Sequence, residues 1–337
     1  MKVTIKDVAR EANVATSTVS RVLSDNPRIS DETKKRVNEA IKKLNYKPNP
    51  IARSLAKNET RILGVVLPSD ANDLLANPFF INAMKGMSMY AQSKNYYITY
   101  AFSKNEENEF ENIKEMTSSN LVDGVILLRV KENDESVRYL KDKKFPFVVV
   151  GRPEYLDEVL WVDNNNFQAM YKVVNQLIEK GHRKIGFAGA MKNLNMSRDR
   201  FEGYKKALEM NNIEFDESLV VHKDEFKEYE GESACKELLE NKDITAIVTI
   251  DDLLAFGVLK ELKRQKITNI AVVGFNNTQL AQYQKPPLAS VDINADKLGY
   301  QATKLLIQTL EDNKESETTH YIVNTEFVER KSFISNK

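Results

Sequence analysis

Six short, continuous apolar runs constrain the fold of this chain most strongly. Each is too uniformly apolar for a strand with one face in water, and longer stretches of helical periodicity separate them. Parallel strands that helices cover on both faces have this pattern. Strands of this kind, spread over about 270 residues, exceed one compact sheet, so we predict two Rossmann-like α/β subdomains. The runs are 62–67, 125–128, 147–150, 184–188, 246–250 and 270–273, and the helical stretches are 79–95, 167–180, 198–211 and 253–266.

The first sixty residues carry a different charge from the rest of the chain. They hold 13 Lys and Arg against 7 Asp and Glu, whereas the remainder holds 36 against 42. The resulting charges of +6 and −6 cancel, so the formal charge of the whole chain is zero. This asymmetry predicts a basic module for a polyanion, attached to a neutral-to-acidic body.

Composition excludes several classes of protein. An apolar fraction of 42 % is too high for a disordered chain, and no run approaches the roughly 18 apolar residues of a membrane span. Asp7 and Glu11 lie where a signal peptide is basic and then apolar. The single Cys235 excludes an internal disulfide and a cysteine-based metal cluster. We therefore expect a soluble, cytoplasmic protein with no membrane partner, metal or cofactor.

Three short helices are expected at the start of the chain. Thr4 and Asp7 have the spacing of a capping box for the first helix. A second helix is expected from about Thr16, only a few residues after the first ends, which is the helix-turn-helix arrangement. Ser30, followed by acidic residues, is suited to cap the third helix.

The predicted second helix presents short polar side chains to solvent. Its outward positions contain no acid and almost no bulky apolar residue, which suits a helix that enters the major groove. A solvated polar face on a small bundle has the same pattern, but the tight turn and the basic charge favour DNA. The side chains concerned are Thr16, Ser17, Thr18, Ser20 and Arg21.

A short segment after the third helix is expected to be helical only when docked. Asn49 is a good N-cap and Pro50 suits the first helical position, but a helix of about eight residues is unstable alone in water. Residues 49–60 are therefore interpreted as a hinge that folds on DNA, with Leu55 inserted into a minor-groove base step. The alternative is a linker whose Leu55 packs on the body.

Polar residues follow several of the apolar runs. Ligands of parallel sheets bind beyond the carboxyl ends of the strands, so the cleft between two such sheets is the expected site. Hydrogen-bonding groups beside an aromatic face suit a sugar. Phe79 and Phe80, at the start of the first body helix, supply such rings, although ordinary core packing is the alternative for both. The polar residues are Ser69, Asp70, Arg152, Asp251, Asp252, Asn276 and Asn277.

A series of motifs in order resembles the LacI/GalR family of bacterial repressors. In the basic module they are VTIKDVA from Val3, VATSTVSR from Val14, LNYKPN from Leu44 and ARSLA from Ala52. In the body they are GVV from Gly64, DGVI from Asp123, GHRKI from Gly181, RFEGY from Arg200 and VGF from Val273. The resemblance covers essentially the whole chain.

This resemblance implies an all-α helix-turn-helix DNA-binding domain with a hinge helix, joined to an α/β body like that of the periplasmic binding proteins. The expected domains are 1–48, 49–60 and 61–337, with an N-subdomain of about 61–161 and 290–322 and a C-subdomain of about 162–289 and 323–331. DNA contacts are then expected from Thr4, Asn49, Ala52, Arg53 and Leu55, besides those of the second helix.

The resemblance also implies an effector site in the cleft. Arg200 stands where many family members clamp the effector, and Phe226 stands where an aromatic residue often flanks it. The family often has Asn at the position of Asp251 and Asp at that of Asn276, so the acid and the amide look exchanged here. Both groups accept sugar hydroxyls, so a neutral polyol still suits the site. The expected effector contacts are Ser69, Phe79, Phe80, Arg152, Arg200, Phe226, Asp251 and Asn276.

The hypothesis that follows is a homodimeric repressor of a carbohydrate operon, released from double-stranded operator DNA by a small-molecule sugar. The segments 77–80 and 149–154 look like those of maltose-operon repressors of Gram-positive bacteria, which implies maltose or a maltodextrin. The alternative is a catabolite-control-type regulator, whose DNA binding a phosphorylated carrier-protein corepressor activates. A sugar-binding module alone would leave the basic module without a role.

Enzymatic activity is not expected. His182, His222 and His320 lack metal-ligand spacing, and His182 is interpreted as structural. No nucleophile elbow, Walker loop or dinucleotide fingerprint is present in the sequence. Asp251 and Asp252 are adjacent at a strand end, where neighbouring side chains diverge, which disfavours an acid–base pair.

Overall fold

The computed structural model describes residues 3–46, 59–67, 77–103, 105–154, 156–312 and 318–336. The chain divides into two compact units, residues 1–60 and 61–337, and each is described by itself. The predicted hinge helix and some candidate contacts lie outside the described residues. These contacts are Asn49, Ala52, Arg53, Leu55 and Ser69.

The first unit is a three-helix bundle. Helices α1 (Ile5–Glu11), α2 (Thr16–Leu23) and α3 (Asp31–Lys43) enclose a small apolar core. The N–H and the hydroxyl of Thr4 donate to Asp7 Oδ2 at 3.0 and 2.7 Å and fix the start of α1. Asn13, with a φ of 51°, makes the tight turn into α2. The predicted helix-turn-helix arrangement is confirmed.

The second unit contains two six-stranded sheets. The order of the first sheet is β11-β5-β4-β3-β1-β2, and all of its strands are parallel. The order of the second is β12-β10-β9-β8-β6-β7, and only β12 is antiparallel to its neighbour. The first sheet comprises β1 (Ile62–Leu67), β2 (Tyr97–Phe102), β3 (Gly124–Leu127), β4 (Phe147–Val150), β5 (Leu160–Asn164) and β11 (His320–Val323). The second comprises β6 (Ile185–Ala190), β7 (Val220–Lys223), β8 (Ala246–Thr249), β9 (Ala271–Phe275), β10 (Ala289–Asp292) and β12 (Glu326–Val328).

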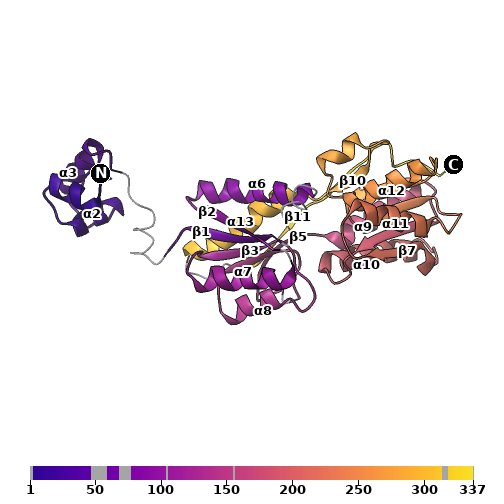
Figure 1. Ribbon diagram of the computed structural model, residues 1–337, viewed down its shortest axis with the longest axis horizontal. Coiled ribbons are helices and arrows are strands. Elements are labelled where there is room, and N and C mark those ends of the chain that lie inside the picture. The colour runs from indigo at the N-terminus through magenta and orange to yellow at the C-terminus, as the bar shows by residue number, and fades with distance from the viewer. Residues whose placement is uncertain are drawn as a thin grey trace. The chain divides into compact units, whose positions relative to one another are not determined.

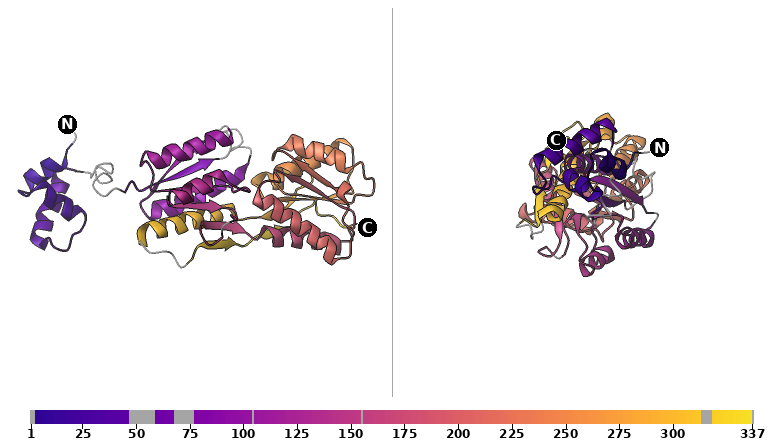
Figure 2. Two further views of the ribbon diagram at one scale, coloured as in Figure 1. Left: turned by 90° about the horizontal axis from the view of Figure 1, so that it is seen from below. Right: turned by 90° about the vertical axis from the view of Figure 1, so that its left-hand side faces the viewer.

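Helices cover both faces of each sheet (Figures 1 and 2). The N-subdomain holds α6 (Pro78–Ser93) and α13 (Ala295–Asp312) on one face and α7 (Glu106–Ser118) and α8 (Glu135–Asp142) on the other. The C-subdomain holds α9 (Asn166–Glu179) and α10 (Asn195–Met210) on one face and α11 (Glu228–Leu238) and α12 (Asp252–Arg264) on the other. Two 3₁₀ turns, η1 (Glu217–Leu219) and η2 (Gln279–Tyr283), complete it. Burial on both faces explains why the strands are continuously apolar. The predicted two-subdomain α/β body is confirmed.

Close helix packing positions α6. A Cβ atom added at Gly86 would lie 1.8 Å from the carbonyl oxygen of Asp296, and one added at Gly299 would lie 2.0 Å from that of Ala83. Only glycine therefore allows α6 and α13 to approach so closely. This contact fixes the N-terminus of α6, where Phe79 and Phe80 lie.

Three segments of the chain pass between the subdomains. They are the crossover segments 164–166, 292–295 and 323–326, which join β5 to α9, β10 to α13 and β11 to β12. β5 continues in the first sheet to Asn164, and β10 continues in the second to Asp292. The chain therefore crosses a few residues after the expected boundaries at 161 and 290, because strand pairing extends that far.

Candidate functional site

The exposed face of α2 carries the candidate base-contacting side chains. Val19 and Val22 face the core, whereas Thr16, Ser17, Ser20 and Arg21 are exposed and Thr18 is half-buried. Ala15 provides no side-chain cap for α2, so the first N–H groups of this helix are available to an acceptor such as a phosphate oxygen. Thr4 is exposed, and its hydroxyl hydrogen is used by Asp7.

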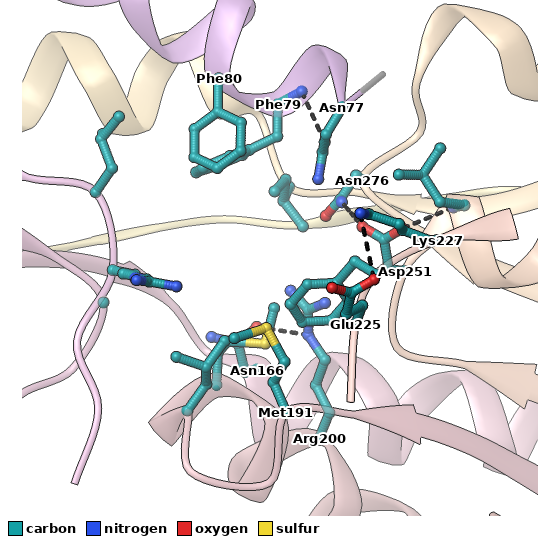
Figure 3. Close-up of a pocket in the computed structure, with 18 of the residues that line it drawn as sticks. Asn77, Phe79, Phe80, Asn166, Met191, Arg200, Glu225, Lys227, Asp251 and Asn276 are labelled. Atoms are coloured by element: carbon teal, nitrogen blue, oxygen red, sulfur yellow. Dashed lines mark hydrogen bonds and ion pairs between the residues drawn. The ribbon is translucent and has the colours of Figure 1, made fainter. Parts of the chain in front are cut away.

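A cavity of about 1210 Å³ lies between the two subdomains of the body. Both subdomains line it, and six of the candidate effector contacts are among its lining residues. These are Phe79, Phe80, Arg200, Phe226, Asp251 and Asn276. Figure 3 shows Asn77, Phe79 and Phe80 on one side of this space and Arg200 and Asn166 on the other.

Arg152 was expected in the cleft, but it is not among the residues that line the cavity. Its guanidinium lies 5.4 Å from the ring centroid of Trp161. Its carbonyl accepts a hydrogen bond from Asn195 Nδ2 at 2.8 Å, which joins the two subdomains. Stacking on an aromatic ring therefore takes this side chain away from the position expected for it.

The aromatic wall comes from α6 and from the loop before α11. Asn77 caps α6 through its Oδ1, which accepts from Phe79 N at 3.1 Å. The rings of Phe79 and Phe80 meet edge to face, 5.2 Å apart. Both rings and that of Phe226 are half-buried, packed on the core and open to the cavity, so each combines the two roles considered for the phenylalanines at 79 and 80.

Arg200 provides the cation of the site. It is 2 % exposed, its Nε donates to Asn166 Oδ1 at 2.9 Å, and its Nη1 donates to the carbonyl of Ile250. The guanidinium carbon lies 4.2 Å from the ring centroid of Phe275. Burial lowers the pKa of Arg200 to about 10, which leaves it charged at neutral pH. No carboxylate of the described residues pairs directly with it, so donor capacity is left for a ligand.

Asp163 provides an unpartnered acceptor beside this cation. It is 5 % exposed, and its Oδ1 accepts from Asn164 N at 2.7 Å and from Asn166 Nδ2 at 3.0 Å. Its Oδ2 is buried and has no hydrogen-bond partner among the described residues. Burial raises the pKa of Asp163 to about 6. A buried acceptor without a partner is costly, which a ligand hydroxyl would relieve.

The exchanged acid and amide contact each other directly. Asn276 Nδ2 donates to Asp251 Oδ2 at 2.6 Å, and Asp251 Oδ1 accepts from Leu253 N at 2.6 Å as the cap of α12 (Figure 3). Burial raises the pKa of Asp251 to about 6. Because the amide nitrogen is bonded to the acid, Asn276 is oriented with its Oδ1 free to accept from a ligand.

Sequence reasoning missed part of the site. Asn77, Arg129, Asp163, Asn164 and Asn166 all line the cavity. Three of them belong to the polar run after β5, which would have been found by the same strand-end rule had β5 been recognised as a strand. The rim also carries charged residues, among them Lys260, which pairs with Glu228 and Glu232 at 2.8 Å each.

The described residues contain no group of three or more His, Cys, Asp or Glu arranged to bind a metal ion. His182 is fully buried, its Nδ1 bonds Thr245 Oγ1 at 3.0 Å and its Nε2 bonds the carbonyl of Ile334 at 2.9 Å. Its role is therefore structural. Among the described helices, none combines the length and apolar character needed to span a bilayer.

Comparison with known proteins agrees with both parts of this description. The family described as "Bacterial regulatory proteins, lacI family" matches residues 4–49, and the "Periplasmic binding protein-like domain" matches residues 174–333. HTH-type transcriptional regulator MalR of Streptococcus pneumoniae is 37% identical over 326 residues, which is 95% of this chain and 97% of that protein. MalR of Staphylococcus xylosus is 33% identical, covering 98% of both chains.

A solved structure of similar fold contains a sugar. The "transcriptional regulator CelR-cellobiose complex" has a TM-score of 0.76 and 28% sequence identity, covering 98% of this chain and 100% of that one. The relatives are named as transcriptional regulators rather than enzymes. The chain belongs to the LacI family of bacterial regulatory proteins, which are DNA-binding transcriptional regulators.

Proposed function

We propose that this protein represses a carbohydrate-utilisation operon and that maltose or a maltodextrin, bound in the cavity of the body, releases it from its operator. The observation that carries the sugar is the pair formed by Arg200 and Asp163. One offers N–H groups, and the other offers a buried oxygen without a partner. Adjacent hydroxyls of a sugar can accept from the first and donate to the second.

The other walls of the cavity support a neutral sugar. Asn276 Oδ1 is a further acceptor, and the rings of Phe79, Phe80 and Phe226 offer apolar faces for a pyranose. The two buried acids, Asp163 and Asp251, would oppose a phosphorylated or carboxylated ligand. The volume of about 1210 Å³ exceeds that of an ordinary small-molecule pocket, which leaves room for at least a disaccharide.

The names of the relatives favour a glucose disaccharide or a longer chain. The two MalR relatives share a name that refers to maltose regulation, and the solved CelR structure contains cellobiose. Maltose and maltotriose are therefore the first ligands to test.

DNA recognition is assigned to α2 and to the hinge. The side chains of Thr16, Ser17, Thr18, Ser20 and Arg21 would read one half-site in the major groove, with Thr4 near the phosphate backbone. The residues proposed for the hinge contact are Asn49, Ala52, Arg53 and Leu55.

A homodimer through the body supports this assignment, because two half-sites give useful affinity. Large apolar side chains are exposed at one edge of the first sheet and beside the second. Tyr97 and Phe102 lie on the edge strand β2, and Tyr283 of η2 is 71 % exposed. Exposed side chains of this size are unusual at a surface that stays in water. We propose the division of the body into subdomains of 61–164 with 294–323 and 165–293 with 324–331.

Titration of operator DNA tests the proposal. The affinity for operator should fall when maltose or maltotriose is present at saturation, whereas sucrose, ribose and sugar phosphates should have no effect. A thermal-shift screen over the same compounds identifies which of them binds. If none of them changes operator affinity, induction by sugar is wrong; if operator affinity rises only with a phosphorylated carrier protein, the corepressor alternative is correct.

A further inference from the structure

One buried amide holds the three crossover segments of the body together. Asn164 lies in the first crossover segment and is 2 % exposed. Its Nδ2 donates to the carbonyl of Ile293 at 3.0 Å and to that of Val323 at 2.9 Å. These carbonyls belong to the second segment and to the start of the third. Both hydrogens of the amide are therefore used, one for each of the other two segments.

The position of Asn164 in the strand pairing explains this reach. Asn164 is the last residue of β5 and pairs in register with Val323, the last residue of β11. Ile293 follows β10, which belongs to the second sheet. The side chain of Asn164 thus connects the end of the first sheet to the segment that leaves the second.

The same segment reaches the cation of the cavity through hydrogen bonds. Asn164 N donates to Asp163 Oδ1, Asn166 Nδ2 donates to the same oxygen, and Asn166 Oδ1 accepts from Arg200 Nε. These contacts measure 2.7, 3.0 and 2.9 Å. A continuous chain of hydrogen bonds therefore runs from Arg200 to the carbonyls of the other two crossover segments. The unpartnered Oδ2 of Asp163 branches from the middle of this chain into the cavity.

We propose that Asn164 is a positioning residue that couples the cavity to the angle between the two subdomains. It holds the three crossover segments in one arrangement, and a ligand on Asp163 and Arg200 acts on the segment that carries it. The holding of the segments is a property of the protein without ligand. Its part in induction rests on the proposed function. Spatial continuity alone does not establish such coupling, so the test measures coupling itself.

The first experiment uses the full chain without any ligand. Asn164→Asp keeps the size of the side chain but has no N–H to donate, and Asn164→Ala removes the side chain beyond Cβ. Amide hydrogen exchange in peptides spanning residues 293–296 and 323–326 should become about tenfold faster in both variants, as loss of a hydrogen bond predicts. If exchange changes only around residues 163–166, while circular dichroism shows a folded protein, the proposal is wrong.

Asn165→Ala is the matched control. Asn165 is the neighbouring residue in the same crossover segment, and its Oδ1 accepts from Gln168 N at 3.0 Å within its own helix. This variant should accelerate exchange at the start of α9 and leave the other two segments unchanged. Equal acceleration of all three segments in the control would mean that any loosening of α9 has the same effect, and would overturn the role of Asn164.

The second experiment measures coupling with maltotriose as the probe. The ratio of operator dissociation constants with and without maltotriose should fall to below about twofold in the variants at residue 164, although they still bind maltotriose. The control should keep the ratio of the unaltered protein. A full ratio in both variants would overturn the coupling. If the unaltered protein does not respond to maltose or maltotriose, the proposed function fails, and the exchange experiment still decides whether Asn164 holds the segments.

Discussion

The two units of this chain place their charges in opposite surroundings. In the DNA-binding unit, Arg21 and Asp7 are exposed, and the hydroxyl and N–H of Thr4 lower the pKa of Asp7. In the body, Arg200 and Asp163 are buried, and burial raises the pKa of Asp163.

This difference indicates how each unit responds to its partner. An exposed charge remains hydrated and is screened by salt, so it suits a phosphate backbone, for which affinity is electrostatic. A buried charge depends on each hydrogen bond that surrounds it, so removing one partner is costly. We therefore expect the DNA-binding unit to be sensitive to salt and the body to be sensitive to single substitutions.

The largest effect is expected for Arg200→Ala. It removes the donor of the cavity and leaves Asp163 and Asp251 without a neighbouring positive charge, so maltotriose binding should weaken by about 3 kcal/mol or more. Isothermal titration calorimetry measures this loss, and operator binding should persist. Lys205→Ala is the control, because Lys205 lies on the same helix and its ion pair with Glu202 is exposed. Unchanged affinity for maltotriose in Arg200→Ala would show that the sugar binds elsewhere.

A smaller effect is expected for Arg21→Ala in the other unit. Loss of a base or phosphate contact should weaken operator binding by about 1–3 kcal/mol and, for a phosphate contact, reduce the salt slope by about one. Fluorescence anisotropy over a series of salt concentrations measures both quantities. Arg28→Ala changes the charge of the same unit equally from a position outside α2. Equal losses in the two variants would indicate that only net charge matters.

The exchanged pair in the cavity should show coupling of about 1–2 kcal/mol. Asn276→Asp places two carboxylates together, and Asp251→Asn removes the charge to which the amide donates, so each single variant should weaken maltotriose binding. The double variant restores one acid and one amide and should recover part of the loss. Additive losses in a double-mutant cycle would mean that the 2.6 Å contact does not orient Asn276 for the ligand.

The smallest effect is expected from pH. The pKa of both Asp163 and Asp251 is about 6 in the folded protein and near 3.8 when unperturbed, so the folded state binds more protons between about pH 4 and 6. Their contribution to the free energy of unfolding should therefore fall as pH rises through this window, by on the order of 1 kcal/mol per pH unit for each group.

Urea unfolding at several pH values checks this slope. It should be reduced in a variant with Asn at both positions. Asp7 has the opposite sign, because its pKa is lowered: its contribution is present above about pH 4 and is lost as pH falls further. A slope that is identical in the variant and in the unaltered protein would contradict burial of the two acids.

The central strands were predictable because burial on both faces gives them a continuous apolar signal. β1 and β4 have the predicted bounds, and β3, β6, β8 and β9 differ by one or two residues. The strands β2, β7 and β11 were missed, and they lie at or beside sheet edges where polar or exposed side chains such as Tyr97 and His320 interrupt that signal.

The site was predictable where it follows a recognised strand. Asp251 and Asn276 come after β8 and β9 and meet as the strand-end rule predicts. Asp163 and Asn166 were missed because β5 combines Trp161 with polar residues and does not form an apolar run. Arg152 was misplaced because its contact with Trp161 depends on the tertiary structure.

The central claim is that the cavity of the body and the DNA-binding unit share one thermodynamic equilibrium. Calorimetric titration of maltotriose into the protein alone and into its operator complex tests this directly. If maltotriose weakens operator binding by some factor, operator must weaken maltotriose binding by the same factor. We predict equal factors well above one, whereas identical maltotriose affinity in the presence and absence of operator would contradict the account.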